Sequence, residues 1–390
     1  MAAAPKRVGI LTGGGDVPGL NAVVKAAVAR LSASGVEVIG VRRGWAGLLH
    51  ASPEPGADNS EWLRPLDSRA TRALDREGGT VLHTSRTNPS LLPQERVPER
   101  LRALRRPSDG TGLIDLTDQV LEVIAALGFD ALIAIGGDGT LSFARRLHHE
   151  GVPIVAVPKT MDNDVPGTDY CLGFSTAVTR AVELINDLRT VAGSHERILI
   201  VEVFGRRSGE PCLMAAHLAG ADRAVVAELP FEPDEVARRL AADRAANPSR
   251  YAVAVISEGA RPLGGELFTR GAVDPAGNPK LGGVGDFLAH AVERATGART
   301  LAQSLGYILR AGLPDALDLL VAKCFGQMAA ELLLDGSTGR MTAVVDGRYA
   351  AVDLGRLGPA RSKIDLERFY DRREYRPRLE GLVGRPLFLH

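Results

Sequence analysis

Two glycine-rich segments lie where an apolar run gives way to a helical pattern. Residues 12–21 read TGGGDVPGLN after the run 7–11, and residues 135–140 read IGGDGT after the run 131–135. Backbone N–H groups in such turns can approach a phosphate closely, and the dipole of the following helix favours the anion. Asp138 is a residue type that can hold Mg²⁺ through water. The alternatives are ordinary strand-to-helix turns and, for Asp138, a helix cap.

A third segment, residues 158–164, reads PKTMDND and follows the apolar run 154–157. Asp162 and Asp164 are two residues apart, so in an extended loop they project to the same side. Paired carboxylates near a metal can divide the work: one accepts a hydroxyl proton and the other orients the ion. Lys159 beside them suggests a counter-charge for a phosphate. The alternative is an Asx-rich surface turn.

Short apolar, β-branched runs alternate with longer amphipathic stretches and must position these segments. Beyond the runs above, strands are expected at residues 36–41, 153–157, 197–203 and 251–256, and helices at 21–31, 117–127, 177–189 and 233–246. This alternation indicates βαβ units and a largely parallel sheet, and hence an α/β fold. Ligands bind such sheets beyond the carboxyl ends of the strands, where the glycines lie.

Composition narrows the classes of function. Among 390 residues, Lys+Arg and Asp+Glu both number 47, which argues against a nucleic-acid or membrane-surface partner held by bulk charge. Three cysteines lie far apart, which argues against a disulfide framework or a zinc site. The N-terminal residues lack a secretory apolar region, and no run of about 18 apolar residues occurs. We therefore expect a cytoplasmic protein without a membrane segment.

Three further segments carry weaker signals. Residues 51–60 and the Arg/Pro-rich residues 85–112 are expected to form loops or insertions. The charged and aromatic tail, residues 361–390, indicates no role beyond packing or a subunit contact.

The motifs together resemble the 6-phosphofructokinase family, and the match continues in order along roughly the first 330 residues. The IGGDGT segment alone is weak, because NAD kinases and diacylglycerol kinases are similar there, whereas the ordered set is specific. The further matching segments are 79–86 (GTVLHTSR), 194–197 (SHER), 202–206 (EVFGR), 257–259 (SEG) and 306–310 (GYILR).

The resemblance implies a role for each matching position. Asp162 would be the base on the 1-hydroxyl of the sugar, Thr160 and Arg206 would act on the transferring phosphoryl group, and Asp138 with Asp164 would serve Mg²⁺. The positions implied for the phosphoryl donor are Gly13, Gly14, Trp45, Arg86, Gly137, Asp138, Gly139, Thr140 and Lys159. The positions implied for the sugar phosphate are Arg197, Phe204, Gly205, Glu258, Arg299, Tyr307 and Arg310.

Two positions bear on the donor. Pyrophosphate users of the family typically carry Asp where Gly139 stands, and that side chain crowds out the α-phosphate of a nucleotide. Lys159 resembles the pyrophosphate-using branch, although family members that combine this glycine with this lysine generally use ATP. The expected donor is therefore ATP, with pyrophosphate still open.

The sugar-phosphate segment departs from the family pattern. Leu301 stands where an arginine is expected, and Arg299, two residues earlier, would lie on the same face of a strand and is the candidate to substitute for that arginine. Tyr307 stands for a frequent His, and Phe204 for a Met. A kinase of a related sugar phosphate, such as a heptulose phosphate, and a non-enzymatic sugar-phosphate- or nucleotide-binding regulator both stay open.

The resemblance also implies two Rossmann-like three-layer domains with mainly parallel sheets and the active site between them. The donor domain would take residues 1–173 and 310–355, and the sugar-phosphate domain residues 174–309 and 356–390. Arg197 would reach the 6-phosphate of fructose 6-phosphate from a neighbouring subunit. We therefore expect a homo-oligomer, either a dimer or a tetramer.

Overall fold

The chain folds as two compact units that alternate along the sequence. The computed structural model describes residues 4–104, 112–271, 280–378, 380 and 383. The first unit comprises Met1–Thr160 and Gly312–Pro359, and the second comprises Met161–Ala311 and Ala360–His390. Compared with the expected bounds, the main difference is residues 161–173, which group with the second unit.

The first unit is a three-layer α/β sandwich around a mainly parallel sheet. Within the described residues the strand order is β13-β12-β7-β6-β1-β2-β3, with β13 and β3 antiparallel to their neighbours. The strands are β1 (Arg7–Thr12), β2 (Glu37–Val41), β3 (Leu63–Leu66), β6 (Ala131–Gly136), β7 (Ile154–Pro158), β12 (Arg340–Val345) and β13 (Arg348–Asp353). The helices are α1 (Leu20–Ser32), α2 (Trp45–His50), α3 (Thr117–Ala126), α4 (Asp138–His149) and α9 (Ala316–Leu334).

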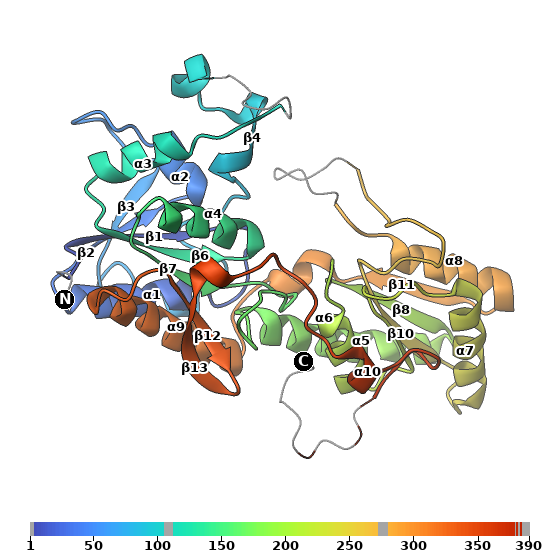
Figure 1. The fold of residues 1–390 in the computed structure, drawn as a ribbon. Helices are drawn as coiled ribbons and strands as arrows, with labels where there is room; N and C mark the ends of the chain where they lie inside the picture. Colours follow the sequence, from blue (N-terminus) through green and yellow to red (C-terminus); the bar gives the residue numbers. More distant parts are fainter. Residues whose placement is uncertain (1–3, 105–111, 272–279, 379, 381–382, 384–390) are drawn as a thin grey trace. The chain divides into compact units, whose positions relative to one another are not determined.

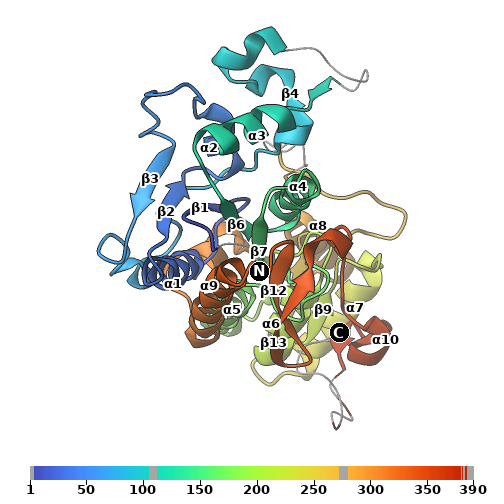
Figure 2. The same cartoon turned by 60° about the vertical axis from the view of Figure 1, so that its left-hand side comes forward.

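Apolar faces hold these layers together. All six residues of β6 are buried, as expected for a central parallel strand covered on both sides. Helices α1 and α9 lie side by side against one face of the sheet, and α4 packs on β6 and β7 (Figures 1 and 2). Strand β2 follows β1 in the chain and lies on one side of it in the sheet, whereas β6 lies on the other side of β1. This change of direction is the point where open α/β sheets bind ligands.

Short elements fill the predicted loop regions of this unit. Residues 51–60 contain no helix or strand, as expected. The region 85–112, of which residues 105–111 lie outside the described residues, carries only short elements: η2 (Pro89–Leu91), β4 (Leu92–Pro93), η3 (Gln94–Arg96) and η4 (Glu99–Leu104). Strand β4 pairs with β5 (Leu113–Ile114). The remaining 3-10 turns are η1 (Leu74–Arg76) and η6 (Leu354–Arg356).

The second unit is a smaller sandwich around a parallel sheet. Its described strands run in the order β11-β8-β10-β9. They are β8 (Ile198–Val203), β9 (Arg223–Val225), β10 (Ala252–Ser257) and β11 (Thr300–Ser304). The helices are α5 (Phe174–Ser194), α6 (Glu210–Leu218), α7 (Pro233–Ala246) and α8 (Val284–Thr296). Helices α7 and α8 pack together over one face, and α5 and α6 cover the other (Figure 1).

The C-terminal tail packs onto the second unit. It forms α10 (Leu366–Phe369) and a small hairpin of β14 (Tyr370–Asp371) and β15 (Arg376–Pro377), and β15 contacts β9 and α6. The tail is fixed by the buried Arg223, which donates to both carboxylate oxygens of Asp243 (2.6 and 2.7 Å) and to Glu374 (3.0 Å). The tail is therefore part of the fold of this unit.

Candidate functional site

The two glycine turns of the first unit lie against each other. They follow β1 and β6, which are parallel neighbours, and Gly13 N–H donates to the Ile135 carbonyl at 2.9 Å. A Cβ atom on Gly13 would stand 2.4 Å from Thr140 Oγ1, and one on Gly136 would stand 2.4 Å from Thr140 Cβ. Glycine is required at both positions because the buried Thr140 side chain packs beneath them. Thr140 therefore supports the turns from inside.

Gly139 is different, because the fold does not need a glycine there. It is an exposed residue in the first turn of α4, and a Cβ atom added to it would meet no atom within 4 Å. Asp138 beside it is also exposed and begins the helix, while Gly137 occupies the N-cap without a side-chain hydrogen bond. The first-turn N–H groups of α4 therefore border open space, as an anion site requires.

Lys159 adds a positive charge beneath the first turn. It is 3 % exposed, its Nζ donates to the Gly15 carbonyl, and its backbone N–H donates to Gly136 at 3.0 Å. On the outer side, Gly14 N–H donates to the Ser85 carbonyl at 2.8 Å, which ties the turn to the half-buried Arg86 segment. The predicted donor residues Gly13, Gly14, Arg86, Gly137, Asp138, Gly139 and Lys159 thus gather at one edge of the sheet.

Trp45 does not line that edge. Its side chain is 1 % exposed, its ring packs edge-on against Phe143 at 5.1 Å, and its indole N–H donates to the Thr140 carbonyl at 3.2 Å. Trp45 belongs to the core behind the turns. The expectation that Trp45 contacts the phosphoryl donor is corrected, because a ring enclosed by protein offers no face to a ligand.

In the second unit, Asp162 is a carboxylate with a raised pKa. Its Oδ2 accepts a hydrogen bond from the backbone N–H of Arg206 at 3.2 Å. Burial, and next the nearby Glu258 carboxylate, raise the pKa of Asp162 to about 6, although the Arg206 amide and the Arg310 and Arg206 cations oppose that rise. A carboxylate with such a pKa is ionised at neutral pH and is a better proton acceptor than an ordinary aspartate.

The loop between the two carboxylates is a tight turn, and the expected extended conformation is corrected. Asn163 has a φ of 52° and is fully buried. Its Oδ1 accepts from Cys171 N–H at 2.8 Å, and its Nδ2 donates to the Asp169 carbonyl and to the buried Glu210, each at 3.0 Å. Asn tolerates this left-handed conformation better than most residues. The sequence argument missed Asn163, although an Asn between two Asp residues is a turn signal.

An arginine and two aromatic rings form the face beyond the carboxyl ends of β8 and β11. Arg310, at the end of η5 (Gly306–Arg310), has its guanidinium 4.6 Å from the Phe204 ring centroid and 5.4 Å from that of Tyr307. The two rings meet edge-on at 6.4 Å. Rings on a guanidinium fix its plane, and the edge of a planar guanidinium has the geometry for a bidentate contact to an anion.

Gly205 brings this face close to the Asp162 turn. Its φ is 136°, and an added Cβ atom would stand 2.3 Å from Ser257 Oγ and 2.5 Å from the Ser208 carbonyl. Glu258 follows β10 and donates its N–H to the Val203 carbonyl at 2.9 Å. Phe204, Gly205, Glu258, Tyr307 and Arg310 therefore lie at the carboxyl edge of the second sheet, as predicted from their motifs.

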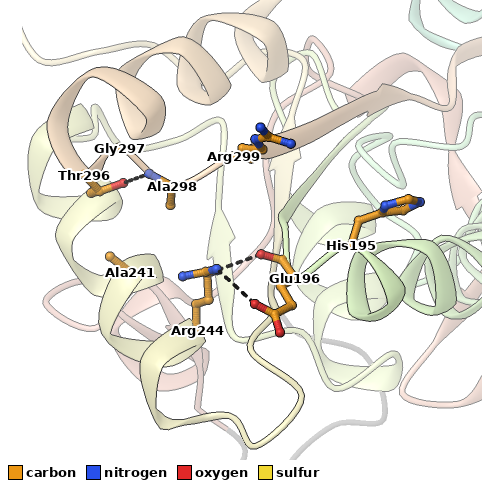
Figure 3. Close-up of a pocket in the computed structure, with 8 residues that line it drawn as sticks. All are labelled: His195, Glu196, Ala241, Arg244, Thr296, Gly297, Ala298 and Arg299. Carbon is orange, nitrogen blue, oxygen red and sulfur yellow. Dashed lines mark hydrogen bonds and ion pairs between the residues drawn. The ribbon is translucent and has the colours of Figure 1, made fainter.

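Arg197 and Arg299 lie at the opposite edge of that sheet. Arg197 precedes β8 and Arg299 precedes β11, and Arg299 carbonyl accepts from Ile198 N–H at 3.0 Å. Figure 3 shows Arg299 in a shallow pocket with His195 and Arg244, the latter donating to the Glu196 carbonyl at 2.8 Å. The expectation that Arg299 replaces a missing arginine beside Arg310 is corrected within one chain, because the whole length of β11 separates them.

Metal-binding side chains do not cluster in the described part of the chain, where no group of three His, Cys, Asp or Glu residues could hold an ion. Mg²⁺ is usually held by one or two carboxylates together with substrate phosphates and water. The exposed Asp138 carboxylate at the start of α4 fits that mode of binding. In the same described residues, no helix has the length and apolar character to cross a membrane.

Comparison with known proteins identifies the class and then the family. The ATP-dependent 6-phosphofructokinase 3 of Streptomyces coelicolor is 40 % identical over 87 % of this chain and 90 % of its own. The pyrophosphate–fructose 6-phosphate 1-phosphotransferase of Amycolatopsis methanolica is 39 % identical over 93 % of this chain and 97 % of its own. Both are phosphotransferases, and the fold and strand-end turns described above belong to that class.

Solved structures and the family model agree. The phosphofructokinase of Saccharomyces cerevisiae superimposes with a TM-score of 0.70, 26 % identity and coverage of 90 % of this chain and 45 % of that one. A pyrophosphate-dependent phosphofructokinase of Marinobacter aquaeolei has the same fold, with a TM-score of 0.73, 21 % identity and coverage of 97 % and 90 %. The family model Phosphofructokinase matches residues 7–333. The chain belongs to the phosphofructokinase family and is a kinase.

Proposed function

We propose that the protein transfers a phosphoryl group from Mg-ATP to the 1-hydroxyl of fructose 6-phosphate. The observation that carries the proposal is the Asp162 carboxylate, whose pKa is raised to about 6, in the same unit as the Arg310–Phe204–Tyr307 face. A base and an anion-binding arginine in one unit suit a substrate that carries both a hydroxyl group and a phosphate.

Each step is assigned to residues of the chain. Arg310 binds the 6-phosphate, Glu258 and Gly205 position the sugar, and Asp162 accepts the proton as the 1-hydroxyl attacks. Arg206 and Thr160 stabilise the charge of the phosphoryl group in flight. Along the sequence, Thr160 is the last residue of the first unit that the proposal uses, and Asp162 is the first one of the second unit. The chain therefore passes from the donor residues to the acceptor residues within three positions.

The donor phosphates are assigned to the glycine turns of the first unit. The N–H groups of the turns and of α4 would hold them, with Lys159 and Arg86 as counter-charges. When bound with the donor, Mg²⁺ supplies charge neutralisation of its phosphates, and Asp138 and Asp164 are the carboxylates proposed to hold the ion.

ATP is the preferred donor because of the space at Gly139. The fold would accept a side chain there, so the open space is free for the α-phosphate of a nucleotide. The second candidate donor, pyrophosphate, is favoured by Lys159 and by relatives of nearly equal identity that are named for pyrophosphate.

A coupled assay of the purified protein with fructose 6-phosphate, Mg²⁺ and either donor tests the proposal. Turnover with ATP alone supports the proposal. Turnover with pyrophosphate alone would mean that pyrophosphate is the donor, as Lys159 indicates. If neither donor gives turnover, a heptulose phosphate as substrate or a regulator without turnover replaces the proposed reaction.

The proposal assigns Arg197 and Arg299 to the active site of a second copy of the chain. Both lie at the amino edge of the second sheet, away from Arg310. We propose that Arg197, with Arg299 beside it, reaches the 6-phosphate bound to a neighbouring subunit, so that the active form is a homo-oligomer.

A further inference from the structure

A segment near the C-terminus lies against the loop that carries Asp162 and Asp164. We define residues 360–364 as the strap and residues 161–171 as the catalytic loop; both belong to the second unit. The strap lies after residue 333, where the family match ends. The sequence alone indicates no role for residues 361–390 beyond packing or a subunit contact.

Two hydrogen bonds join the strap to the catalytic loop. Arg361 N–H donates to the Asp164 carbonyl at 3.0 Å, and Lys363 Nζ donates to the Thr168 carbonyl at 2.7 Å. The Lys363 side chain is half-buried, and its charge also acts on the buried Cys171 thiol at the end of the loop. A charge-assisted bond to a carbonyl at a shielded place is stronger than a neutral one.

A third contact connects the strap to the inner support of the loop. Ser362 Oγ donates to Glu228 Oε1, which also accepts Gly209 N–H at 2.8 Å. The next residue, Glu210, begins α6 and accepts the Asn163 side chain. The catalytic loop is therefore held from inside by Asn163 and from outside by the strap, and the two supports meet at the start of α6.

We propose that the strap is a positioning element of the active site and that Lys363 is its positioning residue, holding the catalytic loop in place for phosphoryl transfer. The proposal rests on the proposed function for its kinetic consequence only. A displacement of about 1 Å in a reacting group can lower a rate about 100-fold, so a lost support bond affects kcat before it affects binding.

The test compares Lys363→Gln and Lys363→Arg with the wild-type protein, with Lys323→Gln as the matched control. Lys323 pairs with Asp75 at 3.4 Å, and both residues belong to the first unit. We expect Lys363→Gln to lower kcat about 10- to 100-fold while the KM for fructose 6-phosphate changes less than about threefold. Lys363→Arg, which keeps a charged donor, should recover most of the loss, and Lys323→Gln should match the wild type.

Hydrogen exchange provides a readout that does not need turnover. Peptides covering residues 161–173 should exchange faster in Lys363→Gln, with the rest of the second unit and the Tm unchanged. Wild-type kcat together with unchanged loop exchange in Lys363→Gln would overturn the proposal. Faster exchange across the whole unit with a lower Tm would also overturn it, in favour of a purely structural role. If the wild-type protein shows no turnover with either donor, the proposed function is wrong. Hydrogen exchange in Lys363→Gln then tests by itself whether the strap holds the catalytic loop in place.

Discussion

Asp162 shows how the fold adjusts the pKa of one carboxylate. Burial and the Glu258 charge raise its pKa above the ordinary value of 3.8, to about 6. The folded state therefore penalises the ionised form, so the contribution of Asp162 to stability falls as the pH rises from about 4 to about 6. The rate has the opposite dependence, because only the ionised form accepts a proton.

We expect kcat/KM to fall about tenfold per pH unit below pH 6, where Asp162 becomes protonated. Asp162→Asn should lower kcat at least about 1000-fold and leave fructose 6-phosphate binding nearly intact. At pH 7.5 this variant should be about 1–3 kcal/mol more stable than the wild type in urea unfolding, because the penalised charge is gone. Retained turnover in Asp162→Asn would show that another group is the base.

A substitution at Gly139 tests which phosphoryl donor the protein uses. Its Cβ position is open, so Gly139→Asp should fold normally and place a carboxylate where a nucleotide α-phosphate would lie. We expect kcat/KM for ATP to fall about 100-fold or more, since the added carboxylate and the α-phosphate carry like charges and would meet. Separate assays with ATP and with pyrophosphate measure this effect.

The control for this substitution is Gly358→Asp. Gly358 is likewise exposed, has an open Cβ position and belongs to the first unit. An equal loss of ATP activity in both variants would mean that added charge alone, and not the space at Gly139, explains the result.

At the scale of elements, the C-terminal tail stabilises the second unit. Buried Arg223 of β9 joins α7 to the C-terminal hairpin through Asp243 and Glu374. Removing one partner of a buried ion pair leaves a charge without compensation, which is more harmful than losing an exposed pair.

Arg223→Met should therefore lower the free energy of unfolding by about 2–4 kcal/mol, with Arg376 still compensating part of the Asp243 charge. Arg372→Met, which removes an exposed pair with Glu367, should change it by less than about 0.5 kcal/mol. Urea unfolding followed by circular dichroism measures both. Equal effects of the two substitutions would contradict the assignment of Arg223 as the anchor of the tail.

At the scale of the whole molecule, the proposed contribution of Arg197 to a neighbouring subunit predicts complementation. Asp162→Asn and Arg197→Ala should each be nearly inactive alone. A mixed dimer of the two contains one site with both native residues, so a random mixture should regain about a quarter of the wild-type activity. The measurement is activity after co-refolding, with size-exclusion chromatography to confirm exchange of subunits. If no activity returns although the subunits have exchanged, Arg197 does not contribute to the site of a neighbouring subunit.

Much of the fold and of the candidate site could be predicted from the sequence. Runs of buried β-branched residues predicted the central strands, and the ordered motifs predicted the family, which the comparisons confirm. Chemistry at the carboxyl ends of parallel strands follows from local pattern, because a glycine turn and its strand are neighbours in the chain. The sequence singled out Asp162 by its pairing with Asp164, whereas Glu258 and Arg310 were implied only by the family resemblance, and all three roles stay predictions.

Tertiary structure alone decided which way side chains face and which distant segments meet. Trp45 is in the core and Arg299 is at the far edge of its sheet, because both depend on packing against residues far away in the chain. The left-handed turn at Asn163 is fixed by Glu210 and by Cys171 N–H, which the local pattern does not contain. The strap reaches the catalytic loop across about 200 residues of chain, and no sequence periodicity carries a contact of that range.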